Sequence, residues 1–225
     1  RVQGDGTPVG WSTRFSFTTA GATAVTTPAP ASGTGGATTA TIDKTKLPIG
    51  DGKLTTTTPT KGSLYSCTGT FNGGGAFKDG PWIKSDGTWD LTQKTSVSGS
   101  VKWPSQFTIT TQGSQRVLTG NDLPSHATGT YPIASSDPAY QYDRNPNRIS
   151  SQTMTVTIPA NPTLAAKPTC LGMGAIGVML TGTVFYNAVD AMGRDAGAHE
   201  IQDACGGHPD QSSSYHYHSL SPCAD

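Results

Sequence analysis

Within the segment from Gln152 to Ile158, threonines at 153, 155 and 157 alternate with large apolar side chains at 154, 156 and 158. Met154, Val156 and Ile158 share one face of an extended chain, because successive side chains of a strand point to opposite faces. Pro159 follows, and it cannot donate to a strand ladder. A period of two residues does not fit an amphipathic helix, so this segment predicts a half-buried β-strand.

Similar short segments recur between turn signals along the chain. Strands are expected over residues 11–18, 64–71, 88–93, 96–103 and 106–111, with one or two core strands within 175–189. Hydrophobic residues make up 33% of the chain and charged residues 13%, and much of the rest is Thr, Ser, Gly and Pro. That composition favours strands and turns. We therefore expect a mainly β protein, a sandwich or a barrel-like arrangement of antiparallel sheets with long loops and little helix.

The composition changes along the chain. Residues 20–62 are rich in Thr, Pro and Gly, which is typical of linkers and solvent-facing edges. The expected division is an N-terminal part, residues 1–62, with strands and this Thr/Pro/Gly-rich segment, and a β domain over residues 63–225. The alternative is one continuous domain.

Charge and hydropathy exclude two classes of partner. Lys and Arg together number 15, as do Asp and Glu, and no basic run offers a surface for nucleic acid. No apolar run approaches the roughly 20 residues that cross a bilayer. The sequence opens at Arg1 without a leader, so we expect a mature chain that is secreted, either extracellular or periplasmic.

The four cysteines are even in number and show no paired Cys-x-x-Cys spacing, which favours two disulfides in an oxidising compartment. We favour Cys205 with Cys223, since that bridge closes a loop of about 18 residues, worth about 3 kcal/mol in the chain-entropy model. Cys67 then pairs with Cys170 by elimination. The alternative role for Cys205 is zinc ligation, because Cys-x-x-His is also a zinc spacing.

Histidines gather near the end of the chain. Four of the five fall within 20 residues of one another, namely His199, His208, His216 and His218. In an extended segment the His-x-His spacing places both imidazoles on one face about 7 Å apart, near enough to share a metal ion. Gly206 and Gly207 let the backbone turn tightly, so that His208 can supply a third ligand.

Ligand chemistry limits which metal the histidines would bind and what the nearby acidic residues would do. Imidazole binds Zn, Cu, Fe and Ni, and the affinity order favours copper, with zinc second. Asp203 and Glu200 are candidates for a further ligand, a hydrogen-bond acceptor that orients an imidazole, or a catalytic acid or base. The alternative is a calcium site, although these acids do not match the EF-hand spacing. Its candidate ligands are Asp190, Asp195, Glu200 and Asp203.

Aromatic residues near these motifs are expected to pack. Tyr215 and Tyr217 alternate with the histidines and face away from them. Trp82, Trp89 and Trp103 lie in strand-like segments and are expected in the core, while the alternative is a carbohydrate-binding sandwich that uses them as stacking platforms.

The region from Asp203 through Ala-Cys-Gly-Gly-His-Pro to Tyr-His-Tyr-His and Ser-Leu-Ser-Pro-Cys resembles the YHYH-domain proteins, secreted proteins of bacteria and some algae and protists. The likeness covers roughly residues 64–223. Further shared segments are Gly-Pro-Trp-Ile at 80–83, Leu-Pro-Ser-His-Ala-Thr-Gly-Thr-Tyr-Pro at 123–132, Asn-Pro-Asn-Arg-Ile at 145–149 and Gly-Arg-Asp-Ala at 193–196.

The resemblance implies that His126 belongs to a motif that folds back toward the histidine cluster. Metal binding is suggested for the family because of its histidines. Family members often continue with a second block that contains Asp-Gly and another Tyr-His-Tyr-His, whereas this sequence ends at Asp225. The resemblance therefore implies either a short member or one whose further ligands or strands have been removed.

Two functions follow from these patterns. The leading hypothesis is a secreted, disulfide-bonded β protein that binds copper or zinc through His208, His216 and His218, with His126 or His199 as the next candidates. An enzyme of this kind would use copper redox chemistry or zinc-bound water, with Asp203 or Glu200 as acid or base. The alternative is an extracellular fibre, sheath or surface layer, in which edge strands self-associate and the histidines stabilise or cross-link.

Overall fold

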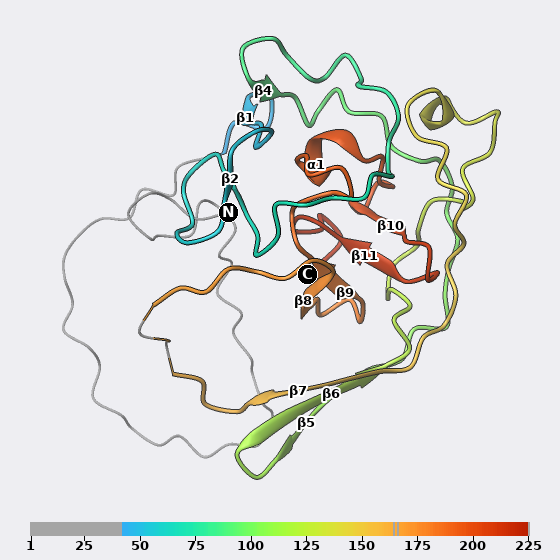
Figure 1. Cartoon of the computed structure of the whole chain (residues 1–225). Helices are drawn as coiled ribbons and strands as arrows, with labels where there is room; N and C mark the ends of the chain where they lie inside the picture. Colours follow the sequence, from blue (N-terminus) through green and yellow to red (C-terminus); the bar gives the residue numbers. More distant parts are fainter. Residues whose placement is uncertain (1–41, 164, 166, 225) are drawn as a thin grey trace.

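A computed structural model describes residues 42–163, 165 and 167–224 of the chain. Short strands joined by long irregular segments make up most of this part, and one short helix lies among them (Figure 1). The mainly β class with little helix is confirmed. None of the sheets formed by the described residues closes into a barrel. The strand expected over residues 11–18 lies outside the described residues.

The strands of the described region are β1 (Leu47–Pro48), β2 (Leu54–Thr55), β3 (Leu64–Tyr65), β4 (Thr88–Trp89), β5 (Phe107–Gln112), β6 (Gln115–Gly120), β7 (Met154–Pro159), β8 (Ala175–Val178), β9 (Val184–Tyr186), β10 (Gly207–Pro209) and β11 (Tyr215–Tyr217). The helix α1 spans Ala196–His199, and a 3-10 turn spans Pro138–Gln141. They form four small sheets, ordered β1-β4, β2-β3, β5-β6-β7 and β10-β11-β9-β8. Most pairs are antiparallel, but β2 with β3 and β11 with β9 are parallel.

The longest strands, β5, β6 and β7, form a sheet at one end of the molecule (Figure 1). Gly113, at a positive φ of 59°, lies in the two-residue turn between β5 and β6. Two of these strands were expected at nearly the observed positions. The central strand β6 was not, because Gln115 and Arg116 hide its short apolar pattern, in which Leu118 is buried.

Two apolar clusters form the core. One surrounds Trp82, whose indole Nε1 donates to the Ala198 carbonyl at 2.8 Å and so fixes helix α1 against the core. The other contains Tyr215 and Tyr217, both fully buried, packed with Leu123 and Met179. The second cluster lies on one face of β11, and the histidines of that strand therefore face the opposite side.

Both favoured disulfides are present, Cys67–Cys170 and Cys205–Cys223. Cys205–Cys223 joins the turn before β10 to the segment that follows β11, so it encloses both histidine-bearing strands. Among the described residues we find no helix with the length and apolar character that a membrane crossing requires.

Several expected strands are shorter than their sequence patterns. The strand expected over 96–103 is replaced by isolated bridges, Val97 with Asp203 and Val101 with Thr128. The 175–189 segment forms two strands, β8 and β9, but β8 is largely exposed rather than a core strand. Residues 96–103 have their backbone partners in irregular segments, whereas β8 and β9 pair with each other in a short ladder. The alternating pattern therefore indicates which side chains are buried, but it does not ensure that the segment pairs with another strand.

Candidate metal centre

Three histidines meet on one face of the β10-β11 pair. His208 and His216 are direct partners in the antiparallel register, and His218 follows two residues later on the same face. The ring centroids of His208 and His216 lie 4.5 Å apart, and those of His216 and His218 lie 4.8 Å apart. One nitrogen from each of the three rings lies within 4.8 Å of the others. We call these residues the histidine trio.

The local sequence explains this pairing. Gly207 has no side chain, and a Cβ at this position would overlap the Tyr215 ring, which lies across β10. Asp210 Oδ1 accepts the backbone N–H groups of Ser212 and Ser214, at 2.8 and 3.1 Å, and so shapes the turn between the strands. Ser213 takes a positive φ of 66° in that turn. The tight connection sets the register that places His208 opposite His216.

Hydrogen bonds fix the tautomers of two rings. His218 Nδ1 lies 2.5 Å from the Asn187 carbonyl oxygen, and His216 Nδ1 lies 3.2 Å from the Ser214 carbonyl oxygen. A carbonyl only accepts, so Nδ1 of each ring carries a hydrogen and donates it. In the neutral ring Nε2 then holds a lone pair. The two Nε2 atoms face each other at 3.1 Å, an arrangement that calls for a shared cation between them.

Glu200 adds a carboxylate to the same space. Its Oε2 lies 3.0 Å from His218 Nε2 and 3.4 Å from His208 Nε2, and the side chain is buried. Gly75 packs so closely that a Cβ there would meet Glu200 Oε1 at 3.1 Å. Oε2 of Glu200 and both ring nitrogens of His208 have no hydrogen-bond partner within the described structure. Buried polar atoms are normally satisfied, and the two of these atoms that face each other, Glu200 Oε2 and His208 Nε2, border a place for a cation.

Electrostatics keeps most of these groups ready to bind a cation. Burial lowers the pKa of His208 to about 4, and it lowers the pKa of His216 well below its ordinary value. Burial also opposes charge on His218, but the Glu200 carboxylate outweighs it and raises the pKa of His218. Burial acts to raise the pKa of Glu200, but the neighbouring His208 and His218 outweigh it and the pKa falls. Without a metal, one proton between His218 and Glu200 takes the cation's place.

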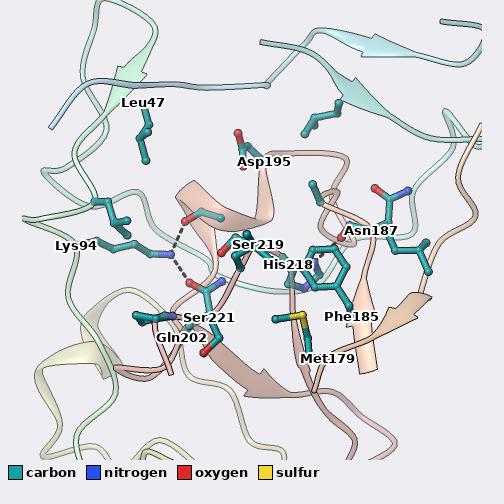
Figure 2. A pocket seen from close by; sticks show the side chains of 18 of the residues that line it. Leu47, Lys94, Met179, Phe185, Asn187, Asp195, Gln202, His218, Ser219 and Ser221 are labelled. Atoms are coloured by element: carbon teal, nitrogen blue, oxygen red, sulfur yellow. Dashed lines mark hydrogen bonds between the residues drawn. The ribbon is translucent and has the colours of Figure 1, made fainter. Parts of the chain in front are cut away.

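The site opens into a cleft of about 910 Å³. The trio and Glu200 line one wall, together with Tyr186, whose ring stacks on His216 at 4.0 Å between centroids. The Tyr186 hydroxyl donates to Asp210 Oδ2 at 2.9 Å, and this bond holds the stacked ring in place. His218 also borders a second, more apolar cavity of about 870 Å³ (Figure 2). The trio therefore lies at the border of a cleft, with its side chains buried.

Asp203 lies on the tyrosine side of β11. Its carboxylate accepts from the Tyr215 hydroxyl at 2.9 Å and from the backbone N–H groups of Gly129 and Cys205 at 3.0 and 2.9 Å. Burial raises the pKa of Asp203 despite these bonds. Its contacts hold the turn before β10, and the structure does not bring it to the trio.

The other two histidines stay outside the trio. His199 has both ring nitrogens on carboxylates, Nε2 at 2.6 Å from Asp51 and Nδ1 at 2.8 Å from Asp79. Two acceptors require two hydrogens on the ring, so His199 is a buried imidazolium. Burial acts to lower its pKa, but the bond to Asp51 outweighs this and the pKa is raised. His126 lies instead beside the Cys205–Cys223 disulfide, with Nε2 at 2.5 Å from the Tyr217 hydroxyl.

The acids proposed for calcium are dispersed in the described part of the chain. Asp190 binds the Arg194 guanidinium at 2.9 Å, and Asp195 accepts the Gly50 N–H at 3.0 Å. Groups of three potential ligand atoms among the described residues are the histidine trio and the set His126, Cys205 and Cys223. The structure therefore offers nitrogen-rich and sulfur-rich sites rather than an oxygen-rich one.

Sequence reasoning missed the residues that orient the rings. Tyr186 and the Asn187 carbonyl reach the trio because β9 pairs with β11 in parallel, with Val184 opposite His216. No local sequence pattern predicts that two strands about 30 residues apart will pair in parallel. The Ser-Ser-Ser segment before β11 was visible in the sequence, but a backbone carbonyl carries no side-chain signal.

Comparisons of this chain with family models, curated proteins and solved structures found no match.

Proposed function

We propose that this protein binds a transition-metal ion through His208, His216 and His218. The observation that carries the proposal is the convergence of acceptor atoms. The Nε2 atoms of His216 and His218 lie 3.1 Å apart beside the buried Glu200 carboxylate. The Nδ1 atom of each ring donates its hydrogen to a backbone carbonyl. One bound metal ion can satisfy all of these lone pairs together.

Copper is the first choice of metal and zinc the second. Three neutral imidazoles are borderline donors, and the divalent affinity order peaks at copper. Glu200 supplies a fourth ligand or a nearby negative charge, which offsets part of the charge of a divalent ion. Its Oε2 already lies within 3.4 Å of two rings.

The cleft beside the trio supports a catalytic role in addition to metal binding. Three protein ligands with one open position are the usual pattern of catalytic zinc, whereas structural sites are closed by four. The trio faces a cleft large enough for a small substrate. In such a reaction Glu200 is the candidate acid or base, because Asp203 is engaged on the other face of β11.

Location and family belong to the same proposal. Two disulfides, Cys67–Cys170 and Cys205–Cys223, suit an oxidising compartment and support a secreted protein. The Cys-Gly-Gly-His and Tyr-His-Tyr-His motifs support membership of the YHYH-domain family, and they overlap β10 and β11, the strands that pair His208 with His216.

A direct metal assay tests the proposal. Protein purified without a His-tag is analysed by elemental mass spectrometry and titrated with Cu(II) and Zn(II) under non-reducing conditions. We expect one ion per chain, lost in His216→Ala and retained in the matched control His126→Gln. No bound metal and no affinity better than micromolar would overturn the proposal.

The second candidate function, self-association, is favoured by the β5-β6-β7 sheet. Its outer strands β5 and β7 each pair on one side only within the described structure, and Ile158 on β7 is 37% exposed. Unpaired strand edges are templates for pairing with another chain. Analytical sedimentation of untreated protein separates the candidates, since polymers support a fibre or layer and discrete monomers contradict it.

A further inference from the structure

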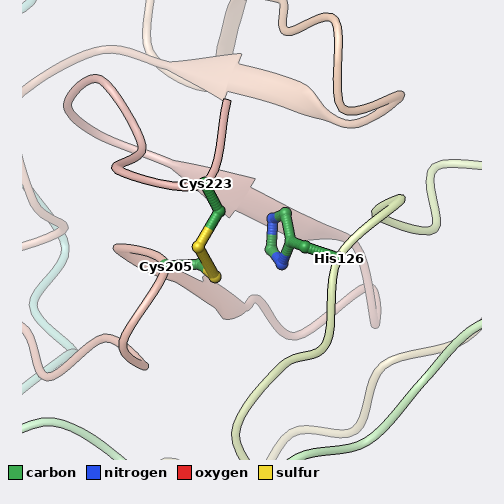
Figure 3. Close-up of side chains that lie close together, drawn as sticks. All are labelled: His126, Cys205 and Cys223. Atoms are coloured by element: carbon green, nitrogen blue, oxygen red, sulfur yellow. A yellow bond between two sulfur atoms is a disulfide. The ribbon is translucent and has the colours of Figure 1, made fainter. Parts of the chain in front are cut away.

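A second set of potential ligands surrounds the Cys205–Cys223 disulfide. The His126 ring faces the two sulfurs (Figure 3), and one of its nitrogens and the two Sγ atoms lie within 4.8 Å of one another. His126 comes from the segment between β6 and β7, far from both cysteines in sequence. Three donors thus meet at a place that the metal proposal does not use.

The sulfurs become strong ligands only when the disulfide is reduced. Two thiolates and an imidazole form a Cys₂His set, which suits Zn²⁺ or Cu⁺. With zinc–sulfur bonds of about 2.3 Å in a tetrahedral site, the two sulfurs lie roughly 3.7 Å apart. The Cα atoms of Cys205 and Cys223 lie 5.3 Å apart, so after reduction both side chains can reach one ion that lies between them.

The hydrogen bonds of His126 suit a metal ligand. Nδ1 lies 2.9 Å from the Ala127 carbonyl oxygen, and Nε2 lies 2.5 Å from the Tyr217 hydroxyl. When one nitrogen binds a cation, the other keeps its present partner. Such a bond is what normally fixes the ring orientation of a metal-bound histidine.

We propose that Cys205, Cys223 and His126 form a redox-controlled metal site. A dithiol reductant cleaves the S–S bond, donating two electrons and two protons and becoming a disulfide itself. Both thiols then lose their protons as Zn²⁺ or Cu⁺ binds, and His126 supplies the third ligand. In the reverse direction an oxidant such as a disulfide takes two electrons from the thiolates, the S–S bond re-forms and the cation leaves.

The site preserves the loop that carries the trio. The disulfide closes the segment that contains β10 and β11, and its sequence separation is 18. A cation held by both cysteines replaces the covalent link with a coordinated one. Reduction in the presence of metal is therefore expected to leave His208 and His216 in register, whereas reduction with a chelator loosens them.

Cobalt titration tests this site apart from the trio. The variant His208→Leu, which disables the trio, is reduced with a phosphine under anaerobic conditions and titrated with Co(II) as a zinc substitute. We expect about one equivalent to bind, with thiolate-to-cobalt absorption in the near ultraviolet, and no such absorption before reduction. Unchanged stoichiometry after reduction, with free thiols verified by mass spectrometry, would refute the site.

Two further variants identify the ligands. His126→Gln keeps all four cysteines and is expected to weaken the reduced-state affinity at least tenfold, while oxidised His126→Gln still binds at the trio. Cys67→Ala/Cys170→Ala removes the other source of thiols and is expected to keep the cobalt band. The proposal is wrong if His126→Gln binds with wild-type affinity, or if the band disappears in a folded Cys67→Ala/Cys170→Ala protein.

Discussion

The tautomers of the trio follow from single backbone contacts. Because Asn187 and Ser214 offer only carbonyl oxygens, His218 and His216 must place their hydrogens on Nδ1. His208 has no such contact, and neither of its nitrogens is paired in the described structure. In the metal-free protein, burial of the His208 ring is therefore less favourable than burial of the His216 and His218 rings, although all three can serve as ligands.

That difference predicts the outcome of His208→Leu. A buried polar group without a partner costs about 1–3 kcal/mol, so the leucine is expected to leave the metal-free free energy of unfolding unchanged or to raise it. Metal at 100 times its dissociation constant stabilises the wild type by about 2.7 kcal/mol, and this gain is expected to vanish. Thermal unfolding with and without Cu(II) measures both effects, and a retained metal-dependent shift in the variant would contradict the role of His208.

Asp122 gives the fold a pH dependence of its own. Burial raises the pKa of Asp122 from 3.8 to about 6, although the Ser214 hydroxyl and the Val184 N–H both donate to its carboxylate. The folded state therefore binds a proton more tightly than the unfolded state. Its contribution to stability is fully present below pH 3.8 and is lost as the pH rises through about 6.

The variant Asp122→Asn is expected to remove this loss. Asparagine tolerates the positive φ of 55° at this position, and its amide can donate to the Ser214 hydroxyl. At pH 8 the variant gains up to about 3 kcal/mol relative to wild type, and near pH 4 the gain disappears. Urea unfolding of metal-free protein at both values measures it. An equal difference in unfolding free energy between the two proteins at both pH values would show that Asp122 does not titrate between pH 4 and pH 8.

At the scale of single elements, the four-residue helix α1 depends on a half-buried lysine. The Lys94 ammonium donates to the Gly197 carbonyl oxygen at 2.6 Å and to the Gln202 side chain (Figure 2). It also donates to the Glu200 carbonyl oxygen at 2.6 Å. Burial lowers its pKa to about 7. A helix this short cannot persist alone, so tertiary contacts such as these place Glu200 beside the trio.

Replacing Lys94 is expected to disturb both stability and the metal centre. Lys94→Met leaves three buried acceptors without a donor and is expected to cost about 2–4 kcal/mol of unfolding free energy. It also frees the backbone of Glu200, so metal affinity falls about tenfold. Lys102→Met, at an exposed position, is the matched control and changes stability by less than about 0.5 kcal/mol. Equal effects of the two variants on urea unfolding and metal titration would contradict this account.

Strand patterns were only partly predictive of elements. The alternation over 152–158 found β7 almost to the residue, since a half-buried strand needs its apolar side chains at every second position. Residues 96–103 alternate as well, yet they form only isolated bridges. Alternation reports which side chains are buried, whereas a ladder also requires a second extended segment at the right distance.

For the whole molecule, the sheets are small and the loops are long, so we expect the two disulfides to supply a large part of the folding stability. Cys67–Cys170 spans 103 residues, and Cys205–Cys223 spans 18. In the chain-entropy model the longer loop gains about 4.7 kcal/mol and the shorter about 3 kcal/mol. Both values are large beside the stability of a typical domain.

Removing each disulfide in turn tests that ranking. Cys67→Ala/Cys170→Ala is expected to lose more unfolding free energy than Cys205→Ala/Cys223→Ala, by about 1–2 kcal/mol, because it frees a longer loop in the unfolded chain. Chemical denaturation of the two double variants, without added metal, measures the difference. The reverse ranking would mean that native contacts around β10 and β11, rather than loop entropy, dominate.

The sequence by itself determined the mainly β class, the presence of two disulfides and the common face of His216 and His218. Each follows from short-range rules, since a strand has a period of two and an even set of cysteines pairs in an oxidised protein. His126, which the resemblance drew toward the histidine cluster, lies in the structure on the tyrosine face of β11, beside Cys205.

Only the tertiary structure decided which residues complete the metal centre. His199 belongs to the same sequence cluster of histidines, but it is held between Asp51 and Asp79, while Glu200 next to it faces the trio. The register of β10 on β11 and the parallel pairing of β9 select the ligands and fix their tautomers. Such pairings depend on contacts between distant segments, and no local period of the sequence encodes them.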